Sequence, residues 1–137
     1  MKYKGKDILR LIPQRKPFVM VDELEQRDEQ TAVTAVTVHK DNYFMMPDGT
    51  MATTGLIEHI AQSCSAFVGS KSTSQHAPVG MIAEVKNFTC SRQPNVGEKL
   101  VTTVTFGFTF GQMTLAHGLS AIGDETICEV DLKIFIQ

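Results

Sequence analysis

The spacing of hydrophobic and polar positions changes several times along the chain, and each spacing predicts an element. Residues 31 to 38 are rich in Val, Thr and Ala, a composition typical of a strand. We expect them to form a hairpin with a strand at residues 18 to 21, joined by the charged segment at residues 27 to 29. Two prolines stop the short helical turns predicted over residues 7 to 11, because proline lacks an amide donor.

A long amphipathic helix is predicted over residues 53 to 68. Thr53 or Thr54 is a suitable N-terminal cap, and Gly69 is the residue type that commonly ends a helix in a left-handed conformation. At 100° per residue the apolar side chains gather on one side of this helix. The other side carries the polar residues Glu58, His59, Gln62, Ser63 and Ser65.

The chain after this helix predicts four strands. They cover residues 79 to 91, residues 103 to 110, residues 114 to 122 and residues 128 to 136. In the second of them Phe106, Phe108 and Phe110 alternate with polar or small residues, so we expect all three rings to face the core. Two strands before the helix and four after it predict one α+β domain over residues 1–137. A curved antiparallel sheet of about six strands would bury the apolar side of the helix.

Length and charge exclude several classes of protein. A chain of 137 residues is the size of one domain. Thirteen Lys and Arg against fifteen Asp and Glu give a net charge of −2, which offers no electrostatic footprint for nucleic acid. No apolar run approaches the roughly 20 residues needed to span a bilayer, and no signal-peptide pattern is present, so we expect a cytoplasmic protein.

Cysteine and histidine spacing predicts no metal. The three cysteines never form a C-x-x-C pattern, and their odd number argues against a disulfide framework. The four histidines are scattered, and no glycine-rich loop precedes a helix, so we expect neither a metal nor a bound cofactor.

Three segments carry a resemblance to a known family. Residues 12 to 22 read IPQRKPFVMVD, residues 55 to 62 read GLIEHIAQ, and the run from Gly80 to Leu100 ends in PNVGEKL. In this order and spacing they resemble the FabA/FabZ-type 3-hydroxyacyl-acyl-carrier-protein dehydratases. The resemblance implies the hotdog fold, in which a sheet wraps around a central helix. It also implies that Glu58 is the catalytic carboxylate.

Two positions depart from the family pattern. Gln14 stands where the family has the histidine of its L-P-H-R motif. The loop from Tyr43 to Gly49 lacks the histidine of the family's G-H-F-P-G motif and is similar to that of the divergent dehydratase-like proteins of aryl-polyene biosynthesis clusters. Because dehydration needs both a proton acceptor and a proton donor, His39 and His59 are the candidates to replace the missing imidazole.

The same resemblance implies further site residues. Gln62 shares a narrow stripe of the helix with Glu58 and would orient its carboxylate. Gly55 would let backbone amides approach the thioester at the positive end of the helix. Met51 offers a flexible apolar side chain for an acyl chain.

The resulting hypothesis is a dehydratase, or a dehydratase-like subunit, that acts on 3-hydroxyacyl thioesters in fatty-acid or polyene synthesis. Its partners would be an acyl-carrier protein, with Arg15 and Lys16 as the local basic candidates, and a second hotdog subunit, in a homodimer or a heterodimer. Two alternatives remain open. One is a non-catalytic acyl-binding subunit that pairs with an active homologue, and the other is an acyl thioesterase.

Overall fold

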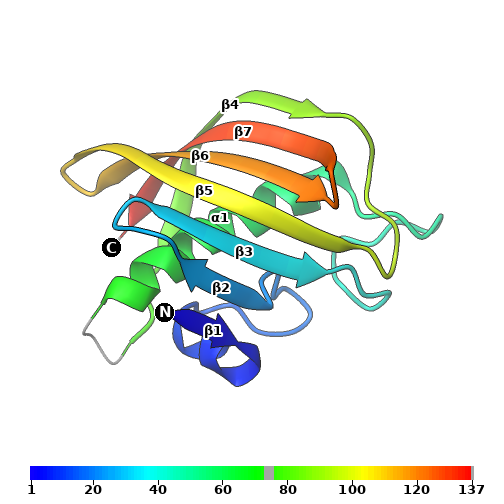
Figure 1. Ribbon diagram of the computed structural model, residues 1–137, viewed down its shortest axis with the longest axis horizontal. Coiled ribbons are helices and arrows are strands. Elements are labelled where there is room, and N and C mark those ends of the chain that lie inside the picture. Colours follow the sequence, from blue (N-terminus) through cyan, green and yellow to red (C-terminus); the bar gives the residue numbers. More distant parts are fainter. Residues whose placement is uncertain (73–75, 137) are drawn as a thin grey trace.

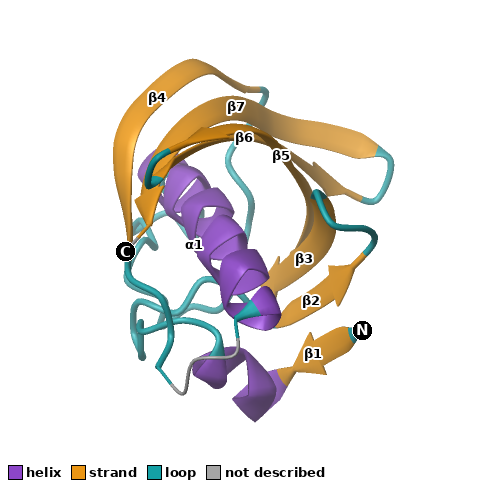
Figure 2. Ribbon diagram, turned by 90° about the vertical axis from the view of Figure 1, so that its left-hand side faces the viewer, coloured by secondary structure: helices purple, strands orange, loops and turns teal. Residues whose placement is uncertain are grey.

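The computed structural model of the protein describes residues 1–72 and 76–136. In chain order the elements are β1 (Lys2–Lys4), the 3-10 helix η1 (Gly5–Arg10), β2 (Glu23–Gln26), β3 (Thr31–Thr37), α1 (Thr53–Lys71), β4 (Gly80–Cys90), β5 (Lys99–Phe110), β6 (Met113–Ile122) and β7 (Glu125–Ile136). The strands form one antiparallel sheet in the order β1-β2-β3-β5-β6-β7-β4 (Figure 1). The sheet curves around α1, which lies on its concave side (Figure 2). This arrangement confirms the predicted α+β class.

The start of the sheet differs from the prediction. The strand that pairs with β3 is β2, not residues 18 to 21, and β1 adds a seventh strand that its charged sequence did not predict. Residues 18 to 21 are apolar, but their backbone bonds to the helix instead of to a strand. The Met20 amide donates to the Gln62 side chain, and the Met20 carbonyl faces the His59 ring.

Both predicted caps of the helix were wrong. Ala52 is the N-terminal cap residue and makes no side-chain hydrogen bond, while Thr53 already belongs to the helix. Gly69 lies within the helix, which continues to Lys71. Glycine is required there because a Cβ atom would collide with the backbone of Leu11, where the segment after η1 crosses the helix.

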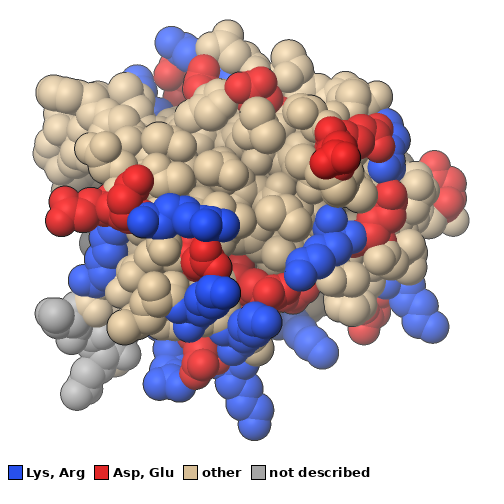
Figure 3. All heavy atoms as spheres, in the orientation of Figure 1, with Lys and Arg blue, Asp and Glu red and all other residues tan. Residues whose placement is uncertain are grey.

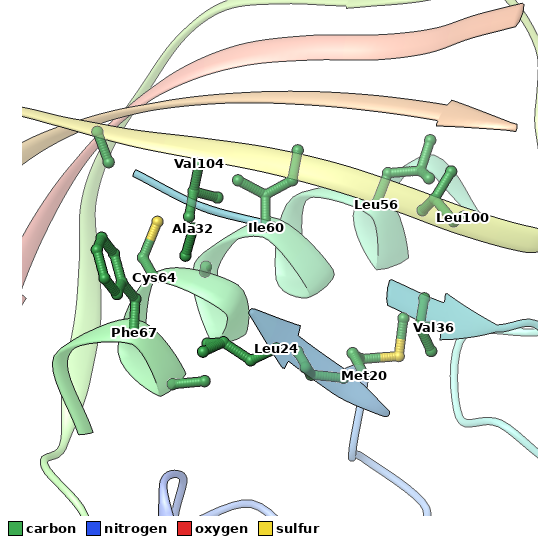
Figure 4. Packing of buried hydrophobic residues seen from close by; sticks show 14 of the residues in the cluster. Met20, Leu24, Ala32, Val36, Leu56, Ile60, Cys64, Phe67, Leu100 and Val104 are labelled. Carbon is green, nitrogen blue, oxygen red and sulfur yellow. The ribbon is translucent and has the colours of Figure 1, made fainter. Parts of the chain in front are cut away.

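The core lies between α1 and the concave side of the sheet (Figure 4). Helix residues from Gly55 to Phe67 are mostly buried. They pack against inward-facing residues of the strands and the segment before β2, including Met20, Leu24, Ala32, Val36, Leu100 and Val104.

The aromatic positions of β5 divide into two groups. Phe106 packs against the core at a ring-centroid distance of 5.0 Å from Phe67. Phe108 and Phe110 are 69% and 46% exposed, so the prediction that they face the core was wrong. The register between β5 and β6 shifts between Phe106 and Thr109, which ends the simple alternation of inward and outward side chains.

The two edges of the sheet differ in the apolar side chains that they expose. At the β1 edge, Lys2 pairs with Glu25 at 3.2 Å and Lys4 with Glu23 at 3.6 Å, and basic and acidic side chains lie close together there (Figure 3). The other edge is β4, which exposes Met81 and two further apolar residues, Ile82 and Val85.

Two of the three free cysteines meet at the β4 edge. Cys90 of β4 lies directly opposite Cys128 of β7 in the antiparallel register. Burial raises the pKa of the Cys128 thiol to about 11. The third, Cys64, is fully buried on α1, and burial raises its pKa to about 12, so neither thiol is an activated nucleophile.

Candidate active site

The Glu58 side chain lines a cavity of about 250 Å³, which lies between α1, the segment before β2, the start of β4 and the end of β7. Its polar lining comes from Gln14, Glu58, Gln62 and Ser65. Its apolar lining comes from Ala61, Met81, Ile82 and Ile134, with Gly80 completing the wall. Glu58, Gln62 and Ser65 share this cavity because residues three, four and seven apart project from the same side of a helix.

Gln62 fixes the orientation of the Glu58 carboxylate. Its Nε2 donates to Glu58 Oε2 at 2.7 Å and to the Phe18 carbonyl at 2.8 Å. Its Oε1 accepts from the Met20 amide at 2.8 Å. Both ends of the amide are therefore committed, and only this assignment of N and O satisfies all three partners. The predicted contact between Gln62 and Glu58 exists in the structure.

Two other polar groups of the cavity lack a partner. The Oε1 atom of Gln14 is buried and, within the described residues, accepts no hydrogen bond. The hydroxyl of Ser65, a residue only 5% exposed, makes no hydrogen bond to any described residue either. An unpartnered buried acceptor costs about 1–3 kcal/mol, so such groups normally mark a site for a ligand or a water.

His59 follows Glu58 in the sequence but does not line this cavity. The ring is fully buried between the helix and the sheet. Its Nδ1 lies 2.6 Å from the Met20 carbonyl, and its Nε2 lies 2.7 Å from the Thr102 hydroxyl. Burial lowers the pKa of His59 to about 4, so the imidazole is neutral near pH 7.

The hydrogen bonds around His59 have only one consistent direction. A carbonyl only accepts, so Nδ1 carries the proton and donates to Met20. Nε2 then accepts from Thr102, which accepts in turn from Ser120 at 2.6 Å. This buried chain connects α1 to β5 and β6.

A second buried pair connects α1 to β3. Ser63 donates to the His59 carbonyl one turn earlier at 2.8 Å, and Thr34 donates to Ser63 at 2.7 Å. His59 and Ser63 therefore face the sheet, although their helical positions had placed them in the same polar group as Glu58.

The remaining predicted site residues lie elsewhere in the chain. His39 is exposed and lines a different cavity, with Lys16 and Asp22. Met51 is fully buried in the core. Gly55 is buried beneath the Phe44 side chain, whose Cβ would lie 2.7 Å from an added Cβ. Within one chain, the structure brings Gln62 to Glu58 but not His39, His59, Gly55 or Met51.

Gln14 is the cavity residue that motif reasoning missed. The sequence marked it only as a departure from a family histidine. Arg15 donates to the carbonyls of Ile12 and Gln14 at 2.9 and 2.8 Å, two bonds within the segment that shape its backbone at Gln14. The sequence did offer one signal for Gln14, which is that it occupies the histidine position of the family motif. The segment that carries this motif contacts α1 through Phe18 and Met20.

The described residues contain neither a metal cluster nor a membrane-spanning helix. Across residues 1–72 and 76–136, no group of three or more His, Cys, Asp or Glu side chains is placed to hold a metal ion. No described helix has the length and hydropathy to cross a membrane.

Comparison with known protein families identifies the family to which the chain belongs. The chain matches the family ApeP-like, described as ApeP dehydratase, over residues 6–136. It belongs to this family. The ApeP-like chain is also 25% identical to the 3-hydroxyacyl-acyl-carrier-protein dehydratase FabZ of Verminephrobacter eiseniae, covering 91% of this chain and 88% of the relative. FabZ of Clostridioides difficile is 26% identical, with 92% of each chain covered.

Solved structures confirm the hotdog architecture. A chain of the dehydratase heterocomplex ApeI:P from Xenorhabdus doucetiae superposes with a TM-score of 0.84 at 17% identity, covering 95% of this chain and 90% of that chain. The PaaI protein of the phenylacetic acid degradation operon of E. coli has a TM-score of 0.63 at 15% identity, covering 82% and 80%. The ApeP-like protein is therefore a dehydratase-like hotdog protein related to FabZ.

Proposed function

We propose that this ApeP-like protein removes water from 3-hydroxyacyl thioesters carried by an acyl-carrier protein, as in fatty-acid or polyene synthesis, with Glu58 as the group that moves the proton. The observation that carries the proposal is the oriented carboxylate at the wall of a cavity. Glu58 Oε2 is bonded to Gln62, and no other hydrogen bond to a described residue holds Oε1. Family membership and the relation to FabZ support the same reaction.

One carboxylate is sufficient for a balanced reaction. Ionised Glu58 takes the proton from C2 of the acyl group, and the electron pair of that C–H bond forms the C2–C3 double bond as the C3–O bond breaks. Protonated Glu58 then returns the same proton to the departing hydroxide, which leaves as water. The glutamate ends in its starting state, so the step needs no imidazole and no external reactant.

Gln62 supports this cycle through its fixed amide. It donates to Oε2 whether Glu58 is ionised or protonated on Oε1, so the reacting oxygen is always the one that is not bonded to Gln62. The neutral lining of Ala61 and Ile134 suits the apolar part of an acyl chain.

We further propose that the protein works in a pair with a second hotdog subunit. The apolar start of edge strand β4 borders the cavity through Gly80, Met81 and Ile82, so a subunit bound at that edge would close the site. The similar structure from Xenorhabdus doucetiae is a heterocomplex, which favours an unlike partner. Arg15 and Lys16, both exposed on the segment that also holds Gln14, are the basic groups nearest the cavity in sequence for an acidic carrier protein.

The experiment measures water loss from a 3-hydroxybutyryl-carrier substrate by the purified protein, alone and mixed with a FabZ-type partner. Glu58→Gln should lower the rate about 10²- to 10⁴-fold, because the amide cannot accept the C2 proton. Glu29→Gln, a matched change at an exposed glutamate away from the cavity, should leave the rate unchanged. Equal rates for wild type and Glu58→Gln would refute the catalytic role.

A second candidate function rests on a specific observation. No described imidazole lines the Glu58 cavity, so a non-catalytic subunit that binds the acyl chain for an active partner is the alternative. In that case the mixed complex would turn over substrate, and Glu58→Gln in this chain would not change its rate.

A further inference from the structure

His59 holds the segment to which the Glu58–Gln62 pair is attached. The two backbone polar groups of Met20 are bonded to two different side chains of α1. The Met20 carbonyl accepts from His59 Nδ1 at 2.6 Å, and the Met20 amide donates to Gln62 Oε1 at 2.8 Å. His59 and Gln62 lie about one helical turn apart, so together they fasten this non-strand segment to the helix.

The position of Met20 decides what Gln62 does with its other end. Because the Met20 amide occupies Oε1, the Gln62 NH₂ group is turned toward Phe18 and Glu58. If the segment shifted, Oε1 would lose its donor and the amide would be free to turn over. A turned amide would present Oε1 to the Glu58 carboxylate, which repels it.

We propose that His59 is a positioning residue for Glu58, acting through the Met20 backbone and the Gln62 amide. The inference rests on the proposed dehydratase function only for its kinetic consequence. The geometry itself does not depend on the reaction, because the His59 ring neither lines the cavity nor bonds to the Glu58 carboxylate.

An imidazole suits this task for a physical reason. Its two nitrogens lie on opposite edges of a rigid ring, so one side chain reaches the loop segment and the sheet together. The Nδ1 edge bonds to Met20, and the Nε2 edge bonds to Thr102 of β5. The Nδ1 bond is the one that fixes the Met20 carbonyl, while the Nε2 bond contributes to stability by attaching the ring to the sheet. Asn or Gln at this position reaches only one of the two partners.

This difference in reach provides the test. His59→Asn places its amide nitrogen near the position of Nδ1, which preserves the donor to Met20 and gives up the Thr102 contact. His59→Gln places its amide near Nε2, which preserves the Thr102 contact and gives up Met20. Thr102→Val removes the sheet partner without touching Met20 and measures the structural cost alone.

The kinetic expectation separates positioning from packing. His59→Gln should lower kcat about 10- to 100-fold, the scale of a misplaced catalytic group, with KM changed less than about twofold. His59→Asn and Thr102→Val should keep kcat within about threefold of wild type even where their melting temperatures fall. A purely structural histidine would give melting temperatures that fall without this split in kcat.

A second readout works without any turnover. In ¹⁵N-labelled protein, the Gln62 side-chain NH₂ signals should exchange slowly with water in wild type, His59→Asn and Thr102→Val. In His59→Gln the same signals should exchange at least about tenfold faster, because the amide loses its fixed partners. If wild type has no dehydratase activity but this pattern appears, the positioning role stands and the proposed function fails.

Three results would overturn the proposal. The first is a kcat loss in His59→Asn equal to that in His59→Gln. The second is a His59→Gln protein that keeps both wild-type kcat and slow Gln62 exchange. The third applies if the His59→Gln protein does not fold. In that case a loss of kcat in either folded variant, His59→Asn or Thr102→Val, rejects the inference.

Discussion

The polar groups of α1 that face the sheet and those that face the cavity differ in how completely they are hydrogen-bonded. Toward the sheet, His59 and Ser63 have every side-chain donor and acceptor committed to a partner on another element or on the helix itself. Toward the cavity, the Ser65 hydroxyl and the side-chain Oε1 atom of Gln14 have no partner among the described residues, and Gln14 Oε1 is fully buried. Since an unpaired buried group lowers stability, the cavity side carries a cost that a purely structural helix would avoid. The paired side positions the helix, and the unpaired side is available to a ligand.

Gln62 belongs to both sides, so replacing it should have the largest effect. Gln62→Leu leaves the Met20 amide and the Phe18 carbonyl unpaired and releases Glu58. We expect the free energy of unfolding to fall by about 2–4 kcal/mol, because each unsatisfied buried group costs about 1–3 kcal/mol. Urea denaturation measures this change. A loss below about 0.5 kcal/mol would show that the three bonds do not hold the segment.

Acid should weaken the paired side through His59. Its pKa is lowered from 6.5 to about 4 in the folded protein, so the unfolded chain binds a proton at a higher pH than the folded chain does. The resulting stability is present above pH 6.5 and is lost as the pH falls from 6.5 toward 4. The full loss is about 3 kcal/mol. Comparing unfolding of wild type and His59→Asn between pH 7 and pH 4 isolates it from the carboxylates, which titrate in both proteins.

The outer face of the sheet supplies a contrasting histidine for this measurement. His117 bonds to Asp131 at 2.7 Å and to Glu129 at 2.8 Å, and these carboxylates raise its pKa above 6.5. Its contribution is therefore present below pH 6.5 and lost as the pH rises above it, opposite in sign to that of His59. Solvent screening makes it small. A stability loss below pH 6.5 that disappears in His117→Gln would contradict the assignment to His59.

The smallest effect compares one hydroxyl from each side. Thr34→Val deletes the buried donor to Ser63 and should cost about 1 kcal/mol. Ser65→Ala deletes a hydroxyl with no described partner and should change stability by less than about 0.5 kcal/mol. Thermal unfolding of the two variants in one buffer measures the difference. Equal losses would mean that the two sides do not differ as the structure indicates.

Periodicity predicted the parts of the fold that depend on local pattern. The long helix, its buried apolar side and the four strands after it follow from residue spacing. The start of the sheet did not, because residues 18 to 21 look like a strand and are held instead by the His59 and Gln62 side chains. A tertiary contact overrode the local strand propensity of these residues. The neighbouring sequence does not show this contact, because His59 and Gln62 lie about 40 residues later in the chain.

The candidate site divides in the same way. Helical geometry placed Gln62 beside Glu58 correctly. The same geometry wrongly grouped His59 with these two residues. A helical-wheel angle does not show that Thr102 of β5 and Ser120 of β6 face inward and form a hydrogen-bonded chain with the ring. A clue was present in the sequence: Thr102 interrupts an inward series that includes Leu100 and Val104. A small polar residue at a core position indicates a buried polar partner on the facing element.

The opposed thiols of Cys90 and Cys128 have a practical consequence for handling the protein. Oxidation that joined them would link β4, the edge strand beside the cavity, covalently to β7. The raised pKa of Cys128 keeps that sulfur protonated at neutral pH and slows the reaction, whereas alkaline buffers would speed it. Preparations stored without reductant should therefore form this crosslink faster as the pH rises toward the pKa of Cys128.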